Sequence, residues 1–328
     1  MIRALYYTPE KPIRTDISPQ DFPSLIKDER SLLWVDFISE PKESAEPILQ
    51  EFGFHPLAID DALEETHTPK LDDWGEYIYI VLNVLNYQRE NGMYNSQIDE
   101  LDIFLGTNYV ITHHDQILAS IEETWSACHR DVRHVQDGPD HLLYRIIDTL
   151  VTGYMPLVEE IDQHIDRIED VVFDRPSRTL VEEIFSLKRT LLAMRRILVP
   201  QREVLNKLAR DDYRMIDPKD RIFFRDIYDH LVRLHDLNES LRDLVSGVMD
   251  TYLSVINNRM NEVMKALAII TTLFMPITFV TGFFGMNFFE PVANLVRWTS
   301  EQMFIVTVGI MLVLPIFMYI WMRRRTWV

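Results

Sequence analysis

Two long runs without a charged residue lie near the end of this chain of 328 residues. They cover residues 266–289 and 303–322, which makes 24 and 20 residues. At about 1.5 Å per residue, each run forms a helix long enough to cross a hydrocarbon core of roughly 30 Å. Two such runs rarely stand together at the end of a soluble domain. We therefore predict two membrane spans, at about residues 266–285 and 303–322.

The distribution of Lys and Arg around these spans predicts their orientation. The loop between them carries only Arg297, whereas Arg323, Arg324 and Arg325 follow the second span. Because basic residues are retained on the cytoplasmic side, both termini are expected in the cytoplasm of a multi-pass protein of the cytoplasmic (inner) membrane. Membrane lipid is therefore an expected partner. The N-terminal segment is too polar for a secretory signal, and the single Cys128 excludes a disulfide within the chain.

The charge of the chain is concentrated before the spans. Residues 1–265 contain 29 Lys and Arg against 49 Asp and Glu, a net formal charge of −20. So acidic a body repels nucleic acid, which is not expected as a partner, and it suits a protein that meets cations. Solubility alone would explain the same charge, so both interpretations stay open.

The pattern along the chain predicts three parts. Residues 1–139 are expected to form a cytoplasmic α/β domain, since segments rich in β-branched and aromatic residues alternate with short helical patterns. The expected strands are 32–38, 77–87 and a hairpin of 97–105 with 109–113, and the expected helices are 43–52 and 55–63. Residues 140–265 form a helical stalk, and residues 266–328 form the transmembrane domain with its basic cytoplasmic tail.

The stalk is expected to consist of three long helices. The first runs to residue 173, and the second covers residues 178–208 after an N-cap at Ser177. The third begins at Pro218 behind an N-cap at Asp217 and continues to about residue 284, which makes it about 100 Å long. So long a helix is a rigid rod that links a cytoplasmic domain mechanically to a membrane gate.

A stripe of small polar and flexible apolar residues follows the membrane end of this rod. Its members recur every three or four residues and therefore share one helix face: Asn261, Met264, Leu267 (or Ala268), Thr271, Met275, Thr278 and Gly282. A helix–helix seam is one interpretation. The other is a pore lining formed by several copies, in which Met264 and Leu267 are apolar constrictions and Asn261, Thr271 and Thr278 supply oxygens.

The stripe leads into the tripeptide Gly285-Met286-Asn287, which ends the first span on a neutral amide. Mg²⁺ loses its water reluctantly and is often held through that water. A ring of neutral amide and carbonyl oxygens accepts hydrogen bonds from the hydrated ion without holding it as tightly as carboxylates would. Gly285 allows the chain to turn out of the helix.

TGFFGMNF (residues 281–288) after a long helix, followed by one further span and a basic tail, resembles the CorA family of magnesium and cobalt channels. The segments RDIYDH, DLVSGVMDTYLSVINNRMNEVMK and FMPITFVTG extend the resemblance over the whole layout. It implies an α+β cytoplasmic funnel domain, a long α-helical stalk and two C-terminal transmembrane helices in a homopentamer. It also implies a pore lined by the first span, with a selectivity ring at Asn287. No prosthetic group is expected.

The outer loop departs from the family pattern. Many members continue with Met-Pro-Glu-Leu after the tripeptide, whereas this chain reads FFEPVANLVRW and keeps one acid, Glu290. The transported ion therefore stays open among Mg²⁺, Co²⁺, Ni²⁺ and Zn²⁺. The retained Gly-Met-Asn favours Mg²⁺ and Co²⁺.

The resemblance also implies regulatory divalent cations, bound at Asp226 between neighbouring subunits. Asp148 matches a family acid on an adjacent helix, and His230 shares the helix face of Asp226. Gln88 stands where another acid is usual, so Glu90 is a possible substitute. The alternative is that these are solvated side chains on helix surfaces.

Other polar groups are not expected to bind metal. His113, His114 and Asp115 are interpreted as the loop that ends a strand. Asp162, His164, Asp166, Glu169 and Asp170 are expected to form a solvated helix face. The chain contains no nucleotide loop, nucleophile motif or HExxH pair, so it is not expected to be an enzyme.

These observations favour a passive channel for Mg²⁺, and for Co²⁺, driven by the membrane potential and closed by cytoplasmic Mg²⁺. Two alternatives remain: a proton-coupled Zn²⁺ or Ni²⁺ transporter on the same fold, and a membrane-anchored sensor that conducts nothing.

Overall fold

The computed structural model describes residues 1–9, 11–64, 67–286 and 301–324. The chain divides into two compact units, Met1–Asp250 and Thr251–Val328. The helix α8 (Arg221–Gly285) contributes residues to both units. The expected boundaries at residues 139 and 265 therefore stay predictions.

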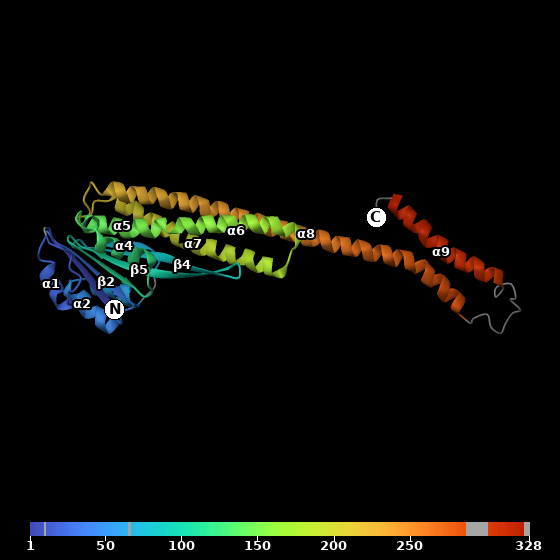
Figure 1. Cartoon of the computed structure of the whole chain (residues 1–328), viewed down its shortest axis with the longest axis horizontal. Helices are drawn as coiled ribbons and strands as arrows, with labels where there is room; N and C mark the ends of the chain where they lie inside the picture. Colours follow the sequence, from blue (N-terminus) through green and yellow to red (C-terminus); the bar gives the residue numbers. More distant parts are fainter. Residues whose placement is uncertain (10, 65–66, 287–300, 325–328) are drawn as a thin grey trace. The chain divides into compact units, whose positions relative to one another are not determined.

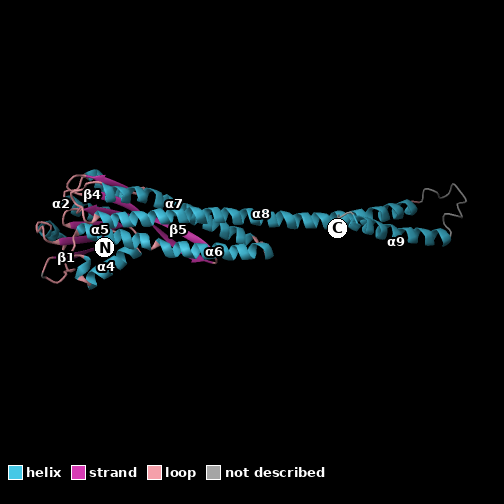
Figure 2. Cartoon of the chain, turned by 90° about the horizontal axis from the view of Figure 1, so that it is seen from above, coloured by secondary structure: helices cyan, strands magenta, loops and turns pink. Residues whose placement is uncertain are grey.

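The first unit contains a mixed six-stranded sheet in the order β1-β2-β6-β5-β4-β3 (Figures 1 and 2). Only β2 and β6 pair in parallel, and the other neighbours are antiparallel. The predicted strand at residues 32–38 and the predicted hairpin around residues 106–108 are confirmed. The strands are β1 (Ile2–Tyr7), β2 (Leu32–Ile38), β3 (Lys70–Asp73), β4 (Ile78–Glu90), β5 (Met93–Leu105) and β6 (Tyr109–His114).

Helices cover both faces of this sheet, so every residue of β2 is buried. Leu33, Val35 and Phe37 belong to an apolar core with α1 (Phe22–Leu25), α2 (Lys42–Glu51) and α3 (Pro56–Glu64). On the other face Trp34 packs against Trp125 of α4 (Ala119–Arg130), with ring centroids 4.9 Å apart. Alternation along a strand sends successive side chains into two separate apolar layers. Two short 3-10 turns, Pro19–Asp21 and Val132–His134, complete the domain.

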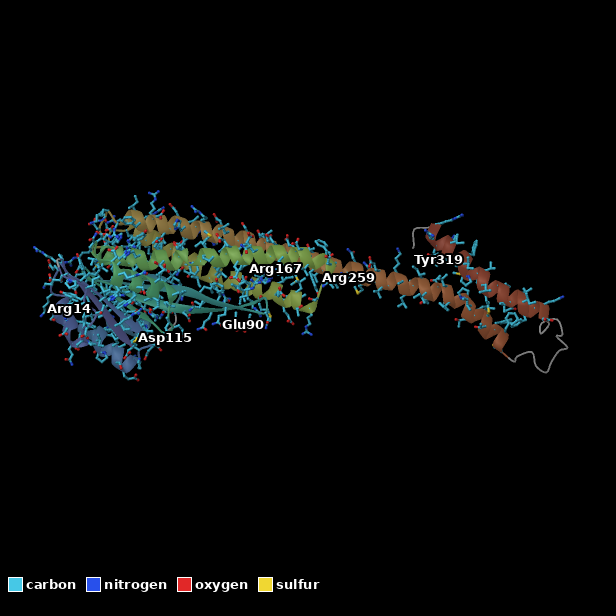
Figure 3. The ribbon with its side chains drawn as sticks, in the orientation of Figure 1. Arg14, Glu90, Asp115, Arg167, Arg259 and Tyr319 are labelled. Carbon is cyan, nitrogen blue, oxygen red and sulfur yellow. The ribbon has the colours of Figure 1, made fainter. Side chains whose placement is uncertain are left out.

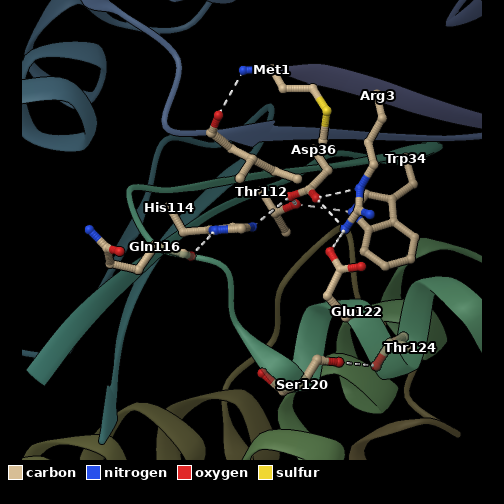
Figure 4. Close-up of polar contacts among 11 residues, drawn as sticks. Met1, Arg3, Trp34, Asp36, Thr112, His114, Gln116, Ser120, Glu122 and Thr124 are labelled. Carbon is tan, nitrogen blue, oxygen red and sulfur yellow. Dashed lines mark hydrogen bonds and ion pairs between the residues drawn. The ribbon is translucent and has the colours of Figure 1, made fainter. Parts of the chain in front are cut away.

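Asp36 of β2 is a buried carboxylate whose charge is balanced within the domain (Figure 4). Its Oδ2 accepts a hydrogen bond from Arg3 Nε at 2.8 Å, and its Oδ1 accepts one from Thr112 Oγ1 at 2.5 Å. His114 Nε2 lies 3.1 Å from Oδ1, and Arg3 also pairs with Glu122 of α4 at 2.6 Å. Because each buried charge is paired, this network joins β1, β2, β6 and α4 without an uncompensated charge.

The helix predicted to run from about residue 140 to 173 is two helices, α5 (Pro139–Thr152) and α6 (Tyr154–Asp174), so this prediction was wrong. They meet at Gly153. Pro156 explains the break, because it has no N–H and its ring clashes with the carbonyl four residues earlier, which is that of Thr152. The predicted N-cap of α7 (Arg178–Arg210) is confirmed: Ser177 Oγ accepts a hydrogen bond from Leu180 N at 3.2 Å.

α8 begins at Arg221 and not at Pro218, so Asp217 is not its N-cap. Asp217 Oδ1 accepts a hydrogen bond from Lys219 N at 3.0 Å, and Asp217 N donates to Asp140 Oδ2 at 2.9 Å. These two bonds stabilise a turn in place of a first helical turn. Further along, α6, α7 and α8 pack through aliphatic side chains, namely Ile165, Ile168, Ile184, Leu187, Val245 and Val248.

The second unit contains the end of α8 and the helix α9 (Glu301–Arg324). Both helices are long and apolar enough to cross a membrane, and none of either apolar stretch is buried inside the structure. Each helix includes a proline, Pro276 in α8 and Pro315 in α9. Such prolines are tolerated in membrane helices where neighbouring groups satisfy the freed carbonyls. The two predicted spans thus correspond to the end of α8 and to α9.

Candidate functional site

All seven residues of the predicted stripe lie on α8 and are exposed in the single chain: Asn261, Met264, Leu267, Thr271, Met275, Thr278 and Gly282. At 100° per residue they fall within an arc of about 120° on the helix surface. The large apolar members are strongly exposed, with Leu267 at 63% and Met275 at 70%. The stripe is therefore a continuous exposed face that carries both apolar and oxygen-bearing side chains.

Thr278, the threonine of the stripe nearest the end of α8, shows how a side-chain oxygen on this face can act as a hydrogen-bond acceptor. Thr278 Oγ1 donates its hydrogen bond to Phe274 O, one turn earlier in the helix, at 2.9 Å. The hydroxyl proton is thus used within the helix, while the lone pairs of the oxygen remain available as acceptors. A side chain in this state can accept hydrogen bonds from the water around a cation.

α8 ends at the predicted tripeptide. Gly285 is its last residue, and Met286 is 54% exposed, with its N–H donating to Phe283 O at 3.4 Å. A Cβ placed on Gly282 or on Gly285 would meet nothing within 4 Å, so packing among the described residues does not require glycine there. Asn287 lies outside the described residues.

The structure brings three of the predicted regulatory residues together. Asp148 of α5 is half-buried, and its burial raises the pKa of its carboxyl group. The charge of His230 lowers this pKa, whereas the nearby charge of Asp226 raises it further. The charges of Asp226 and His230 on α8 therefore act on Asp148 of α5 within one chain. Asp226 itself is exposed and available to a neighbouring molecule.

The fourth predicted residue, Glu90, is the last residue of β4 and is exposed at the hairpin turn (Figure 3). Its neighbour Arg89 pairs with Glu160 of α6 at 3.0 Å, so this turn packs against α6. Within the described part of the chain, no three His, Cys, Asp or Glu side chains are placed to hold a metal ion directly.

The prediction that a strand ends at His113, His114 and Asp115 is confirmed, but the interpretation of the two histidines as a loop was wrong. His113 and His114 lie within β6, are buried and face carboxylates, because β6 is a central strand of the sheet and not the start of a loop. Only Asp115 follows the strand. On α6, Asp162, Asp166, Glu169 and Asp170 are exposed as expected, but His164 is fully buried, with its Nε2 3.0 Å from Glu183 Oε2. Burial lowers the pKa of His164.

Comparison with known proteins identifies the family. The family model described as CorA-like Mg²⁺ transporter protein matches residues 29–324, which is most of the chain. The chain belongs to this family. The resemblance carried by Gly285-Met286-Asn287 and the stalk segments is thereby confirmed, and the family is one of metal ion transporters.

Individual relatives agree with this assignment. The chain is 35% identical to the cobalt/magnesium transport protein CorA of Thermotoga maritima, over 84% of this chain and 77% of that protein. It is 34% identical to the putative metal ion transporter YfjQ of Bacillus subtilis, over 90% and 89% of the two chains. The complete structure of the CorA magnesium transporter from Methanocaldococcus jannaschii has the same fold, with a TM-score of 0.82 at 23% identity, over 100% of this chain and 99% of that one.

We predict that Mg²⁺ stabilises the protein partly through Asp226. Adding millimolar Mg²⁺ to the detergent-solubilised protein should raise its melting temperature, because a ligand that binds only the folded assembly stabilises it by mass action. Asp226→Asn should remove about half of this shift or more. Thermal unfolding followed by intrinsic tryptophan fluorescence measures it.

The matched control is Asp243→Asn, the same change of charge at an exposed position of the same helix. It should keep the wild-type shift. Equal Mg²⁺ shifts in wild type, Asp226→Asn and Asp243→Asn would mean that Asp226 is a solvated carboxylate.

Proposed function

We propose that five copies of the chain form a channel through which hydrated Mg²⁺, and also Co²⁺, enters the cell across the cytoplasmic membrane. The end of α8 lines the pore, Asn287 forms the selectivity ring at its outer mouth, and both termini lie in the cytoplasm. The ion moves down the membrane potential. Cytoplasmic Mg²⁺ bound between subunits holds the channel closed.

The observation that carries this proposal is the exposed stripe of α8 leading directly into the tripeptide. A helix that only anchors a protein needs apolar residues all round, and it has no use for Asn261, Thr271 and Thr278 at regular spacing on one face. One helix cannot enclose a pore, so the stripe requires several copies around an axis. Met264 and Leu267 then form the narrow apolar rings that close by losing their water.

The chemistry of the stripe favours a hydrated divalent ion. It contains no carboxylate, so it cannot strip water from Mg²⁺ and bind it tightly. Hydroxyl, amide and carbonyl oxygens accept hydrogen bonds from the first water shell, as the outward lone pairs of Thr278 allow. The ion is thus recognised through its water and released again.

The acidic body explains how the same ion would control the gate. Five bodies at −20 each sum to about −100, so close packing requires counterions. Cations at Asp226, with Asp148 and His230 on the adjoining helix surfaces, would offset this repulsion and favour the closed assembly. Because the ion binds the closed state better, it shifts the population toward closure, and its effect is limited to that difference in affinity.

We predict that Asn287→Ala reduces Mg²⁺ influx by about tenfold or more, because the ring then loses its side-chain oxygens. Influx is measured in liposomes with an imposed inside-negative potential. Asn294→Ala makes the same change within the outer loop and should conduct like the wild type. Sedimentation of each variant in detergent checks assembly. Wild-type influx in a correctly assembled Asn287→Ala would contradict the selectivity ring.

We also predict that Leu267→Ser raises the leak at high cytoplasmic Mg²⁺, because a hydroxyl wets the apolar constriction. Ile269→Ser adds the same hydroxyl roughly 160° away around the helix and should leave the leak unchanged. Single-channel recording at fixed Mg²⁺ gives the open fraction of each variant. If both variants lose only thermal stability and keep the wild-type leak, the stripe is a packing seam.

A further inference from the structure

A cavity of about 270 Å³ lies in the α/β domain, beside the ends of α3 and β6 and along β5. Its lining contains two histidines and no Lys or Arg. The carboxylates that line it are Glu64, Asp99, Glu100, Asp102 and Asp115, of which Asp115 is labelled in Figure 3. None of the residues singled out from the sequence for metal binding lines this cavity, so it is separate from the pore and from the Asp226 group.

Two buried polar atoms at this cavity lack a hydrogen-bond partner, Glu100 Oε1 and His113 Nδ1. Asp102 is 3% exposed, and its Oδ1 accepts a hydrogen bond from Tyr79 OH at 2.6 Å. His113 is 5% exposed, with its Nδ1 3.6 Å from Asp102 Oδ2, and this nitrogen has no hydrogen bond. Glu100 Oε2 accepts from His67 N at 2.6 Å, whereas the buried Glu100 Oε1 lies 3.7 Å from His67 Nδ1 and has no hydrogen bond. Leaving such atoms unpaired costs stability, so a polar occupant is favoured.

Two lysines near the cavity form ion pairs with other carboxylates than Glu100 and Asp102. Lys70 of β3 forms a hydrogen-bonded ion pair with Asp61 and lies 3.5 Å from Asp72. Lys42 of α2 pairs with Glu64, which lines the cavity, at 2.6 Å and with Asp60 at 3.1 Å. Among the described residues, Glu100 and Asp102 therefore face the imidazoles of His67 and His113 and form no ion pair with Lys or Arg.

The protonation of this pair reflects the missing positive charge. Burial, and next the charge of Asp102, raise the pKa of Glu100 to about 8, although Lys70 and the hydrogen bond from His67 N lower it. Burial also raises the pKa of Asp102, against the contacts of His113 and Tyr79.

We propose that this cavity binds one hydrated divalent cation in each chain, with Glu100, Asp102 and His113 accepting hydrogen bonds from its water. The described residues offer no three side chains at direct coordination distance, so the ion must keep its water. An ion with six waters occupies about 200 Å³, at roughly 30 Å³ per water, which fits the cavity. Mg²⁺ loses its water reluctantly and usually keeps several water ligands when it is bound. The site lies within one chain and does not depend on conduction.

The experiment is a titration of the full-length protein in detergent with Mn²⁺ as the probe ion, followed by electron paramagnetic resonance of free Mn²⁺. Glu100→Gln should bind one ion per chain fewer than the wild type. Asp102→Asn provides a second variant of the same site. Glu123→Gln removes the same charge from an exposed position of α4 and should bind as the wild type does.

Folding of the variants is checked without the ion. The pKa of Glu100 is raised in the folded state, so its ionisation costs stability as pH rises from about 4.5 to about 8. Folded Glu100→Gln should therefore melt at a higher temperature than the wild type at pH 9.

Two results would overturn the proposal. The first is an equal number of bound ions in the wild type and in both folded site variants. The second is nitrogen hyperfine coupling on the Mn²⁺ held at this site, since direct binding to His113 would mean that the ion does not keep its water.

Discussion

Hydrogen bonding within α8 is the constraint on which the rest of the structure depends. In hydrocarbon no water can satisfy a backbone N–H or C=O group, so a span must pair these groups within itself. α8 begins with Phe224, Ile227 and Leu231 buried in the first unit and ends at Gly285 in the apolar run. The same hydrogen-bonded helix therefore carries the exposed Asp226 and the exposed Leu267.

Much of the fold was predictable because it follows from local chemistry. Uncharged runs define the spans, Ser177 caps α7, and β-branched residues mark β2. The features that sequence missed depend on contacts between distant residues. Asp217 fails to cap α8 because its side chain binds Lys219 N and its backbone binds Asp140, a residue 77 positions away. The place of His113 and His114 in the strand β6 depends on their partners Asp102 and Asp36, which lie on neighbouring strands. The break between α5 and α6 has a local cause, Pro156, but the helical periodicity of the apolar residues continues across it and predicts a single helix.

The candidate site, too, has a part that local sequence predicts and a part that depends on contacts between distant residues. Positions of the stripe follow from helical periodicity, since spacing alone fixes the face on which Thr271 and Met275 lie. The grouping of Asp148 with Asp226 and His230 depends on how α5 packs beside α8, which spacing within one helix cannot give. The acidic cavity at Glu100 and Asp102 could not be predicted without the register of β5 and β6, which places Asp102 opposite His113. Sequence identified residue types, and packing decided which of them meet.

The central claim is that a hydrated divalent ion crosses passively along the stripe of α8. The direct test is ion flux into liposomes containing the wild-type protein, with Mg²⁺, Co²⁺, Ni²⁺ and Zn²⁺ compared under an imposed potential, with and without a pH gradient. The account predicts that Mg²⁺ and Co²⁺ enter in response to the inside-negative potential and that the pH gradient has no effect. Zn²⁺ or Ni²⁺ uptake that requires the pH gradient, or no flux of any ion, would contradict it.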